Sequence, residues 1–161
     1  MAEKTTDKIH VAVQNRKARH DFEILKTFEA GIQLQGTEVK SLREGRGNLG
    51  NSYARVENGE VFLHNAHIDE YLQGNRMNHD PMRKRKLLLH KHEIRRMEGR
   101  VQEKGLTLIP LKLYFRNGRA KVDLALARGK RDYDRRRETA KRDSERDMQA
   151  ALKRAQLGSR R

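Results

Sequence analysis

The chain of 161 residues has no cysteine, no tryptophan and only two prolines. The absence of cysteine excludes a disulfide scaffold and any zinc site built from thiolates. No apolar run approaches 18 residues, so the sequence predicts no membrane-spanning helix. Residues 1–8 are polar and include acidic side chains, which is not the pattern of a secretory signal. We therefore expect a cytoplasmic protein.

Catalytic signatures are also missing. The chain has no nucleophile-elbow, phosphate-loop or dinucleotide-binding glycine motif. Two histidine pairs, His64/His67 and His90/His92, are weak indications of a metal site, and the second pair at a helix start should face different directions. We expect no metal, no cofactor and no enzymatic activity.

Positive charge is in large excess, with 37 Lys and Arg against 22 Asp and Glu and a formal net charge of +15. Such an excess costs self-repulsion in the folded state, and a polyanionic partner is the simplest reason to keep it. RNA or DNA fits better than an anionic membrane. With four Phe and four Tyr, a stacking platform for single strands is disfavoured, so recognition of folded RNA by shape and backbone is favoured. We expect a monomer with no membrane partner.

The apolar residues are concentrated in the middle of the chain. We expect a flexible N-terminus over 1–8, a β-barrel RNA-binding domain over 9–128 and a basic tail over 129–161. The tail has few large apolar side chains, so it should be disordered when free. Met148, Ala151, Leu152 and Ala155 follow helical spacing, so the tail should become helical against an RNA surface.

Two Asn-Gly steps, at 58–59 and 117–118, each separate a pair of apolar runs. The runs are 52–56 and 61–65 around the first step, and 106–115 and 120–127 around the second. Asn-Gly is the strongest short hairpin signal because both central residues need a positive φ. A long strand over 21–34 should bulge or bend at Glu29–Gly31. The pattern favours a small closed or nearly closed β-barrel with flanking helices.

Two helices should interrupt the strands. Thr37 is expected to cap a short helix over 38–44 that stops at Gly45. A longer helix should run from about His90 to Lys104, with Ile94, Met97 and Val101 in the core. The polar segment 71–86 reads as an exposed loop.

A basic stretch comes just before the long strand, and we name residues 15–20 the lead-in. It carries Asn15, Arg16, Lys17, Arg19 and His20. Cations neutralise phosphates, and the amide and imidazole add hydrogen bonds or stacking. On composition alone, a solvated basic stretch is the alternative. The run Arg83–Lys86 is less specific, because charge beside Leu87–Leu89 also guards against aggregation.

Several strings, in this order and spacing, resemble the small protein B family of bacterial SsrA-binding proteins. They are Asn-Arg-Lys-Ala-Arg-His-Asp at 15–21, Phe-Glu-Ala-Gly at 28–31, Leu-Gln-Gly-Thr-Glu-Val-Lys-Ser-Leu-Arg at 34–43, Arg-Lys-Leu-Leu-Leu-His at 85–90 and Gly-Lys-Arg-Asp-Tyr-Asp-Arg-Arg at 129–136. Any one string is weak, but the set is specific.

The resemblance implies an oligonucleotide-binding-type β-barrel with flanking helices and a tail that is disordered in isolation. It implies an adaptor of trans-translation that binds the tRNA-like domain of transfer-messenger RNA. That RNA, carried by elongation factor Tu, is delivered to stalled ribosomes. The body stands in for the anticodon arm, and the tail enters the empty mRNA channel along small-subunit rRNA. The nascent chain is then tagged for degradation.

The resemblance also implies roles for individual residues. Those matching the family's RNA-binding positions are Asn15, Arg16, Lys17, Arg19, His20, Glu29 and Lys121. Those matching its contacts with the decoding site and mRNA channel are Lys130, Arg131, Tyr133, Asp134, Arg135 and Arg136. Arg135 stands where the family commonly has Lys, which changes a point charge into a planar fork. Without the resemblance, Glu29 reads as a strand ion pair with Lys26 or another neighbour.

Two other functions remain open from the residues. A structural ribosomal protein also combines a small body with a basic extension. An RNA hydrolase would also need an RNA-binding surface. Salt washing of ribosomes separates an adaptor from an integral protein, and incubation with labelled RNA and a divalent metal tests for cleavage.

Overall fold

The fold was examined in a computed structural model, which describes residues 7–102 and 105–158; of Asn75, Asp132 and Tyr133 it describes the backbone alone. The chain divides into two compact units, Met1–Gly129 and Lys130–Arg161. We call the first unit the body and the second the tail. The prediction for residues 1–6 lies outside the described residues.

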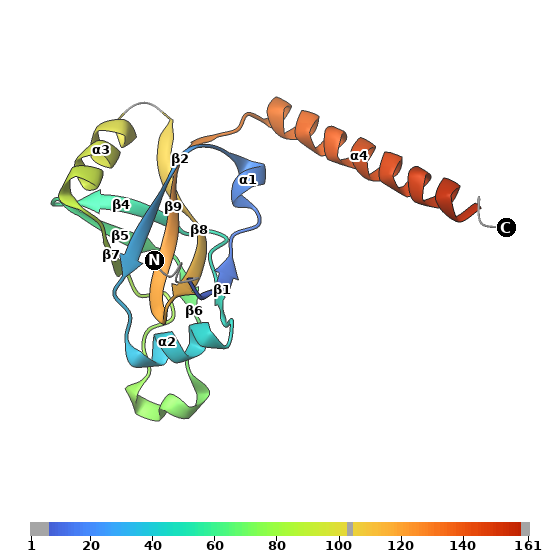
Figure 1. The fold of residues 1–161 in the computed structure, drawn as a ribbon. Helices are drawn as coiled ribbons and strands as arrows, with labels where there is room; N and C mark the ends of the chain where they lie inside the picture. The colour runs from blue at the N-terminus through green and yellow to red at the C-terminus, as the bar shows by residue number, and fades with distance from the viewer. Residues whose placement is uncertain (1–6, 103–104, 159–161) are drawn as a thin grey trace, which may run out of the picture. The chain divides into compact units, whose positions relative to one another are not determined.

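The body is mainly β (Figure 1). Its strands are β1 (Ile9–Gln14), β2 (Phe22–Ile32), β3 (Gly47–Asn48), β4 (Tyr53–Glu57), β5 (Glu60–His64), β6 (His67–Ile68), β7 (Arg85–Leu88), β8 (Leu106–Arg116) and β9 (Arg119–Gly129). Its helices are α1 (Ala18–Asp21), α2 (Gly36–Arg43), the 3-10 helix η1 (Leu72–Met77) and α3 (Lys91–Val101). None of the described helices combines the length and apolar character needed to cross a bilayer.

Seven strands form one antiparallel sheet in the order β1-β8-β4-β5-β7-β2-β9, and β8 also pairs with β9. The pairings therefore run around a barrel. Two seams are short: β4 meets β8 at Ala54 opposite Leu108, and β2 meets β7 at Gly31 and Ile32 opposite Leu88 and Leu87. Figure 1 shows α2 and α3 at opposite ends of this barrel. The predicted class, mainly β with flanking helices, is confirmed.

Both Asn-Gly hairpins are confirmed. Asn58 and Gly59 have φ of 50° and 75°, and Asn117 and Gly118 have φ of 51° and 80°. These values suit turns that match the twist of the flanking strands. Each hairpin fixes a register, with Val56 opposite Val61 in one and Arg116 opposite Arg119 in the other.

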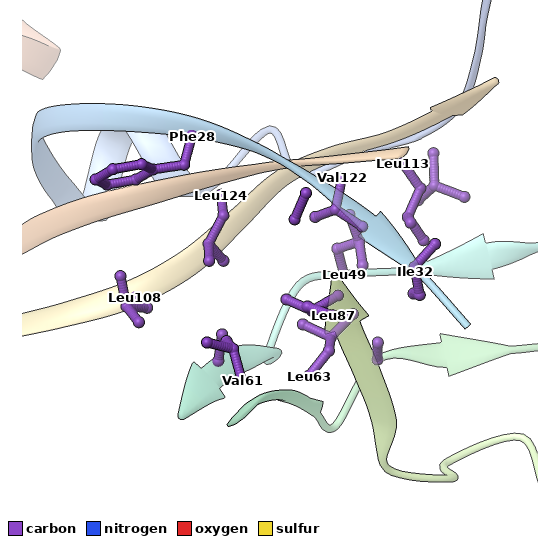
Figure 2. Close-up of a cluster of buried hydrophobic side chains, with 14 of the residues drawn as sticks. Phe28, Ile32, Leu49, Val61, Leu63, Leu87, Leu108, Leu113, Val122 and Leu124 are labelled. Carbon is purple, nitrogen blue, oxygen red and sulfur yellow. The ribbon is translucent and has the colours of Figure 1, made fainter. Parts of the chain in front are cut away.

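The interior of the barrel is a single apolar cluster. Figure 2 shows that side chains of β2, β8 and β9 point toward those of β5 and β7. Val122, Leu124 and Leu126 are buried here, as their alternation predicts. Met97 of α3 is fully buried, and Ile94 and Val101 pack against the cluster.

A second, smaller cluster lies on the other face of the sheet. Ala18 of α1 packs there with Ile109, Leu111, Ala125 and Ala127. Strand β9 is therefore buried on its outer face as well at Ala125 and Ala127. Small side chains at these positions let the short helix α1 approach the strand closely.

The helix ends differ in detail from the prediction. The N-cap of α2 is Gln35, not Thr37, and the Gln35 N–H donates to Glu38 Oε2 at 2.7 Å. The Thr37 hydroxyl instead contacts His79 Nδ1 at 2.8 Å. Gly45 stops the helix with φ of 72°, as expected. The predicted end of the longer helix at Lys104 lies outside the described residues, and α3 ends at Val101.

The expected exposed loop over 71–86 is wrong for its last part. Arg85 begins strand β7 and is fully buried, with its Nε donating to Glu38 Oε1 at 2.8 Å. Arg83 Nη2 donates to Glu38 Oε2 at 2.7 Å. One carboxylate on α2 thus holds two members of a basic run that appeared solvated in the sequence. Burial alone raises the Glu38 pKa, but hydrogen bonds from Arg83 and the Gln35 N–H and the charge of Arg85 outweigh it, so the pKa is lowered.

Two strand features also differ from the prediction. The irregularity in β2 falls between Ile24 and Lys26 rather than at Glu29–Gly31, where the register with β9 is continuous. Strand β1 pairs with β8 and was not predicted. Residues Asp7 and Lys8 extend this pairing, because the Lys8 N–H donates to Asn117 Oδ1 at 3.1 Å.

The described part of the tail is one helix, α4 (Asp132–Gly158). This differs from the expectation of a disordered free tail. The segment consists mostly of strong helix formers and has no proline. Glu138 accepts from Lys130 Nζ and lies 4.0 Å from Arg142 Nη2 one turn later. These local features favour a helix without a packed face.

Candidate RNA interface

The basic lead-in leaves the sheet at the end of β1 and turns into α1. Ala18, only 2% exposed, anchors the turn in the second apolar cluster. The neighbouring Arg16, Lys17 and Arg19 are exposed. The anchor therefore presents three cations from a fixed part of the backbone.

The side chains of Asn15 and His20 form hydrogen bonds within the body. Asn15 Nδ2 donates to Pro110 O at 3.0 Å and to Leu49 O at 3.3 Å. Its Oδ1 is buried and has no hydrogen-bond partner in the described part of the chain. His20 Nδ1 lies 3.0 Å from Asp21 Oδ1. Asn15 thus fixes the start of the lead-in and keeps one free acceptor.

Glu29 projects from β2 into a polar network on the outside of the barrel. Arg116 Nη1 donates to Glu29 Oε1 at 3.0 Å, and the Tyr114 hydroxyl donates to Glu29 Oε2. The same hydroxyl lies 3.1 Å from Asp123 Oδ1, and Lys112 Nζ lies 3.4 Å from Asp123 Oδ2. We call these five residues the Glu29 network. The strand ion pair considered for Glu29 exists, with Arg116 rather than Lys26.

The electrostatics of the network centre on Tyr114. Its side chain is 3% exposed, and burial together with the Glu29 hydrogen bond and the Asp123 carboxylate raises the pKa of its hydroxyl. The hydroxyl therefore stays a hydrogen-bond donor between two carboxylates. Glu29 and Asp123 are held as acceptors, each beside one cation.

Lys121 lies next to this network on β9. It is half-buried, and it stands opposite Gly31 on β2 and Tyr114 on β8. Within residues 7–102 and 105–158, no hydrogen bond or ion pair engages its amine. The amine therefore has no described partner to give up when it binds a phosphate.

Strand β9 brings the predicted body residues onto one face. From the end of β9 backwards, the side chains on its outer face are those of Ala127 and Ala125, which lie beneath α1. Asp123, opposite Glu29, and then Lys121 follow on the same face. Ala18 of the lead-in and the Glu29–Lys121 region are therefore positioned along the same outer face of β9. That the seven predicted body residues form one RNA contact stays a prediction.

The predicted tail residues belong to a separate unit. Lys130 and Arg131 precede α4, while Asp134, Arg135 and Arg136 lie in its first turns. Arg131, Asp134 and Arg136 are exposed. The side chain of Tyr133 lies outside what the structure describes.

Sequence reasoning missed most of the Glu29 network, namely Lys112, Tyr114, Arg116 and Asp123. The signal was present in the second Asn-Gly hairpin. Once the turn is fixed, the register places Tyr114 opposite Lys121. The bulge between Pro110 and Lys112 then places Lys112 opposite Asp123, and a bulge of this kind is not readable from the strand pattern.

The histidines take structural positions. His64 Nε2 lies 2.9 Å from Glu57 Oε1, and His67 Nδ1 lies 3.1 Å from Asp69 Oδ1. The rings of His90 and His92 are stacked with centroids 5.5 Å apart. The expectation that they face different directions is wrong, because His90 is an extended N-cap residue and not part of the helix. Among the described residues, no group of three or more His, Asp or Glu side chains could hold a metal ion.

Comparisons with known proteins agree with this geometry. The family model described as SmpB protein matches residues 12–154. The SsrA-binding protein of Pelotomaculum thermopropionicum is 58% identical over 145 residues, which are 90% of this chain and 95% of the relative. That of Desulforamulus reducens is 55% identical over 159 residues, covering 97% and 99%.

A solved chain from the work "tmRNA-SmpB: a journey to the center of the bacterial ribosome" aligns with a TM-score of 0.64 and 61% identity. The alignment covers 74% of this chain and 84% of that one. The family match spans the lead-in, the Glu29 network and most of α4. The chain therefore belongs to the SmpB family.

Proposed function

We propose that this protein is an RNA-binding adaptor of trans-translation, which binds transfer-messenger RNA and delivers it to stalled ribosomes. The observation that supports it best is the family match, which covers the body and α4 together. A structural ribosomal protein would explain the charge, but not the ordered correspondence through both units.

The outer surface of β2, β9 and β8 is the proposed contact with the tRNA-like domain. Arg16, Lys17, Arg19 and Lys121 supply cations for phosphates, whose neutralisation releases counterions. Glu29 accepts hydrogen bonds from base amino groups or 2′-hydroxyls at a fixed position, because Tyr114 and Arg116 hold its carboxylate. The rigid network selects by geometry, while the lead-in supplies affinity.

The tail is the proposed ribosomal contact. Lys130, Arg131, Arg135 and Arg136 bring cations to rRNA in the decoding region, with Tyr133 stacking on a base and Asp134 accepting a hydrogen bond. The rest of α4 lies in the mRNA channel. The body stands in for the anticodon arm of the RNA that elongation factor Tu carries.

No chemical step is assigned to the protein in this role. The function rests on binding and placement, and tagging of the nascent chain is carried out by the ribosome on the RNA reading frame. Translation occurs in the bacterial cytoplasm, so the proposed role places the protein there.

Binding of labelled tRNA-like-domain transcript to Lys121→Ala and to Arg55→Ala tests the proposal. Both changes remove one exposed or half-exposed cation from a strand, but Arg55 lies on β4, away from the proposed surface. Lys121→Ala should weaken binding severalfold and reduce the salt dependence by about one phosphate contact. Arg55→Ala should leave both unchanged. Equal effects of the two variants would contradict a specific surface and favour general charge attraction.

A further inference from the structure

A hollow lies where α3 meets the barrel, between that helix and strands β2 and β9. Its volume is about 470 Å³. It is lined by Lys26, Phe28, Arg95, Arg96, Gly99, Arg100 and Leu126. None of these belongs to the lead-in or to the Glu29 network, so the proposed transfer-messenger RNA surface does not account for it.

The lining combines an apolar floor with a cationic rim. Phe28 and Leu126 are members of the main core that reach its edge here, and Phe28 lies at the margin of the cluster in Figure 2. Among the residues that the structure describes, every charged side chain of the lining is a cation. Lys26 Nζ lies 5.1 Å from the centre of the Phe28 ring. Leu126 is only 1% exposed and Phe28 9% exposed, so the apolar contact for a ring comes from the exposed part of Phe28 and the backbone of Gly99, while the rim suits an anion.

Two of the cations on the rim, Arg95 and Arg96, are available to bind an anion. Arg95 and Arg96 are exposed on α3, and no hydrogen bond or ion pair with another described residue engages either guanidinium. Each guanidinium can therefore bind an anion at the rim without first breaking an ion pair with a described residue.

Gly99 keeps the hollow open. It lies inside α3, where glycine is the poorest helix former apart from proline. Neither a positive φ nor packing requires it, because a Cβ added there meets no atom within 4 Å. We attribute the glycine to the open space that its lack of a side chain leaves above Phe28 and Leu126.

We propose that this hollow binds one unpaired nucleotide of RNA, with the base on the floor of Phe28, Leu126 and Gly99 and the flanking phosphates on Arg95, Arg96 and Lys26. The volume lies in the range of small-ligand sites. The site rests on the proposed RNA-binding role but is separate from the surface for the tRNA-like domain. It gives the body a second contact with RNA, made to a single-stranded segment.

The test uses the full chain and a dodecamer of uridine with one central 4-thiouridine. After irradiation, mass spectrometry locates the cross-linked residues. Wild type should cross-link to Phe28 or to α3 residues of the hollow. Gly99→Leu, which fills the space, should lower that cross-link yield at least about fivefold, the low end of what one stacked base contributes. Gly99→Ala is the matched control and should stay within about twofold, because one methyl group leaves most of the floor accessible.

A charge test complements the steric one. Arg95→Ala/Arg96→Ala should weaken dodecamer binding at least about fivefold more than the pair Arg55→Ala/Arg76→Ala, and should lower the salt slope by about 1.4, or 0.7 for each phosphate. Arg55 and Arg76 are exposed cations outside the hollow, so both pairs change the net charge equally.

Unchanged cross-linking in Gly99→Leu, or equal losses for the two arginine pairs, would overturn the site. Melting curves verify that Gly99→Leu is folded. Failure of the proposed function has a different signature, in which the hollow binds the dodecamer but the chain shows no preference for the tRNA-like domain.

Discussion

The body and the tail each carry an excess of positive charge but order it in different ways. In the body, cations such as Arg85 and Arg116 are held by carboxylates and backbone carbonyls around an apolar core. In α4, Met148 and Leu152 are each 65% exposed, and ion pairs within the tail, such as Lys130–Glu138, supply the order. In the proposed role, the body brings its own geometry to a partner, whereas the tail takes a fixed place from the surface that it meets.

The largest expected effect comes from separating the two units. A chain that ends at Gly129 retains all of β9, whose last residue pairs with Phe22. It should keep most of its affinity for the tRNA-like domain, because the lead-in, Glu29 and Lys121 are intact, yet it should lose peptide tagging entirely. Filter binding and a tagging assay measure the two outcomes. Tagging at the full rate would show that the tail is dispensable and would contradict separate roles for the body and the tail.

The second effect compares one leucine in each unit. Leu124 is fully buried and Leu152 is exposed. Leu124→Ala should lower the free energy of unfolding of the body by about 2–5 kcal/mol, because it leaves a cavity in the core. Leu152→Ala should change it by less than about 0.5 kcal/mol. Urea unfolding followed by the near-ultraviolet circular dichroism of the tyrosines measures both, and similar losses would show that α4 shares the core.

The third effect concerns the buried pair of Glu38 and Arg85. The folded-state pKa of Glu38 is lowered, so its contribution to stability is present above the unfolded value of about 4.5 and is lost as the pH falls through the folded value. Arg85→Ala should cost about 3–5 kcal/mol, because it leaves the carboxylate buried with less compensation. It should also move acid unfolding to higher pH. Arg76→Ala, which removes an exposed arginine of η1, should do neither, and an acid midpoint unchanged by Arg85→Ala would contradict this account.

The smallest effect on the body should come from a change confined to α4. Ala151→Pro costs roughly 3 kcal/mol of helix. It should reduce the circular dichroism signal at 222 nm in the free chain, yet leave the unfolding midpoint of the body and the affinity for the tRNA-like domain unchanged. A shifted body midpoint would show that the two units unfold together. Tagging should fall, since the proposed mRNA-channel contact requires a helix.

Local signals made the hairpins and the core readable from the sequence. Asn58-Gly59 and Asn117-Gly118 fix their turns through their own backbones, and Val122, Leu124 and Leu126 reveal a buried face by alternation. Strand β1 was missed although Ile9, Val11 and Val13 alternate, because two of the three are exposed on an edge strand. Such a strand is hard to distinguish from a polar terminus by composition.

Long-range partners were not readable in the same way. Arg85 looks like its neighbours in a run of four cations, and only the fold brings it to Glu38, 47 positions earlier. Tyr114 and the Glu29 carboxylate that accepts its hydrogen bond are 85 residues apart in the sequence. The hollow beneath α3 likewise depends on the angle at which that helix packs on the barrel, and the spacing of apolar residues in the sequence does not predict such an angle. The family resemblance located residues of the body surface, but not the network that holds them.

The short seams of the barrel have a consequence for its motion. Strands β2, β9 and β8 pair along most of their lengths, while β4, β5 and β7 join them only at Ala54–Leu108 and at the end of β2 within the described chain. Local opening follows the weakest pairings, so amide hydrogens of β4, β5 and β7 should exchange with solvent before those of β9. The surface proposed for the tRNA-like domain then lies on the slowest-exchanging part of the molecule, and the barrel can open on its other side while that surface keeps its shape.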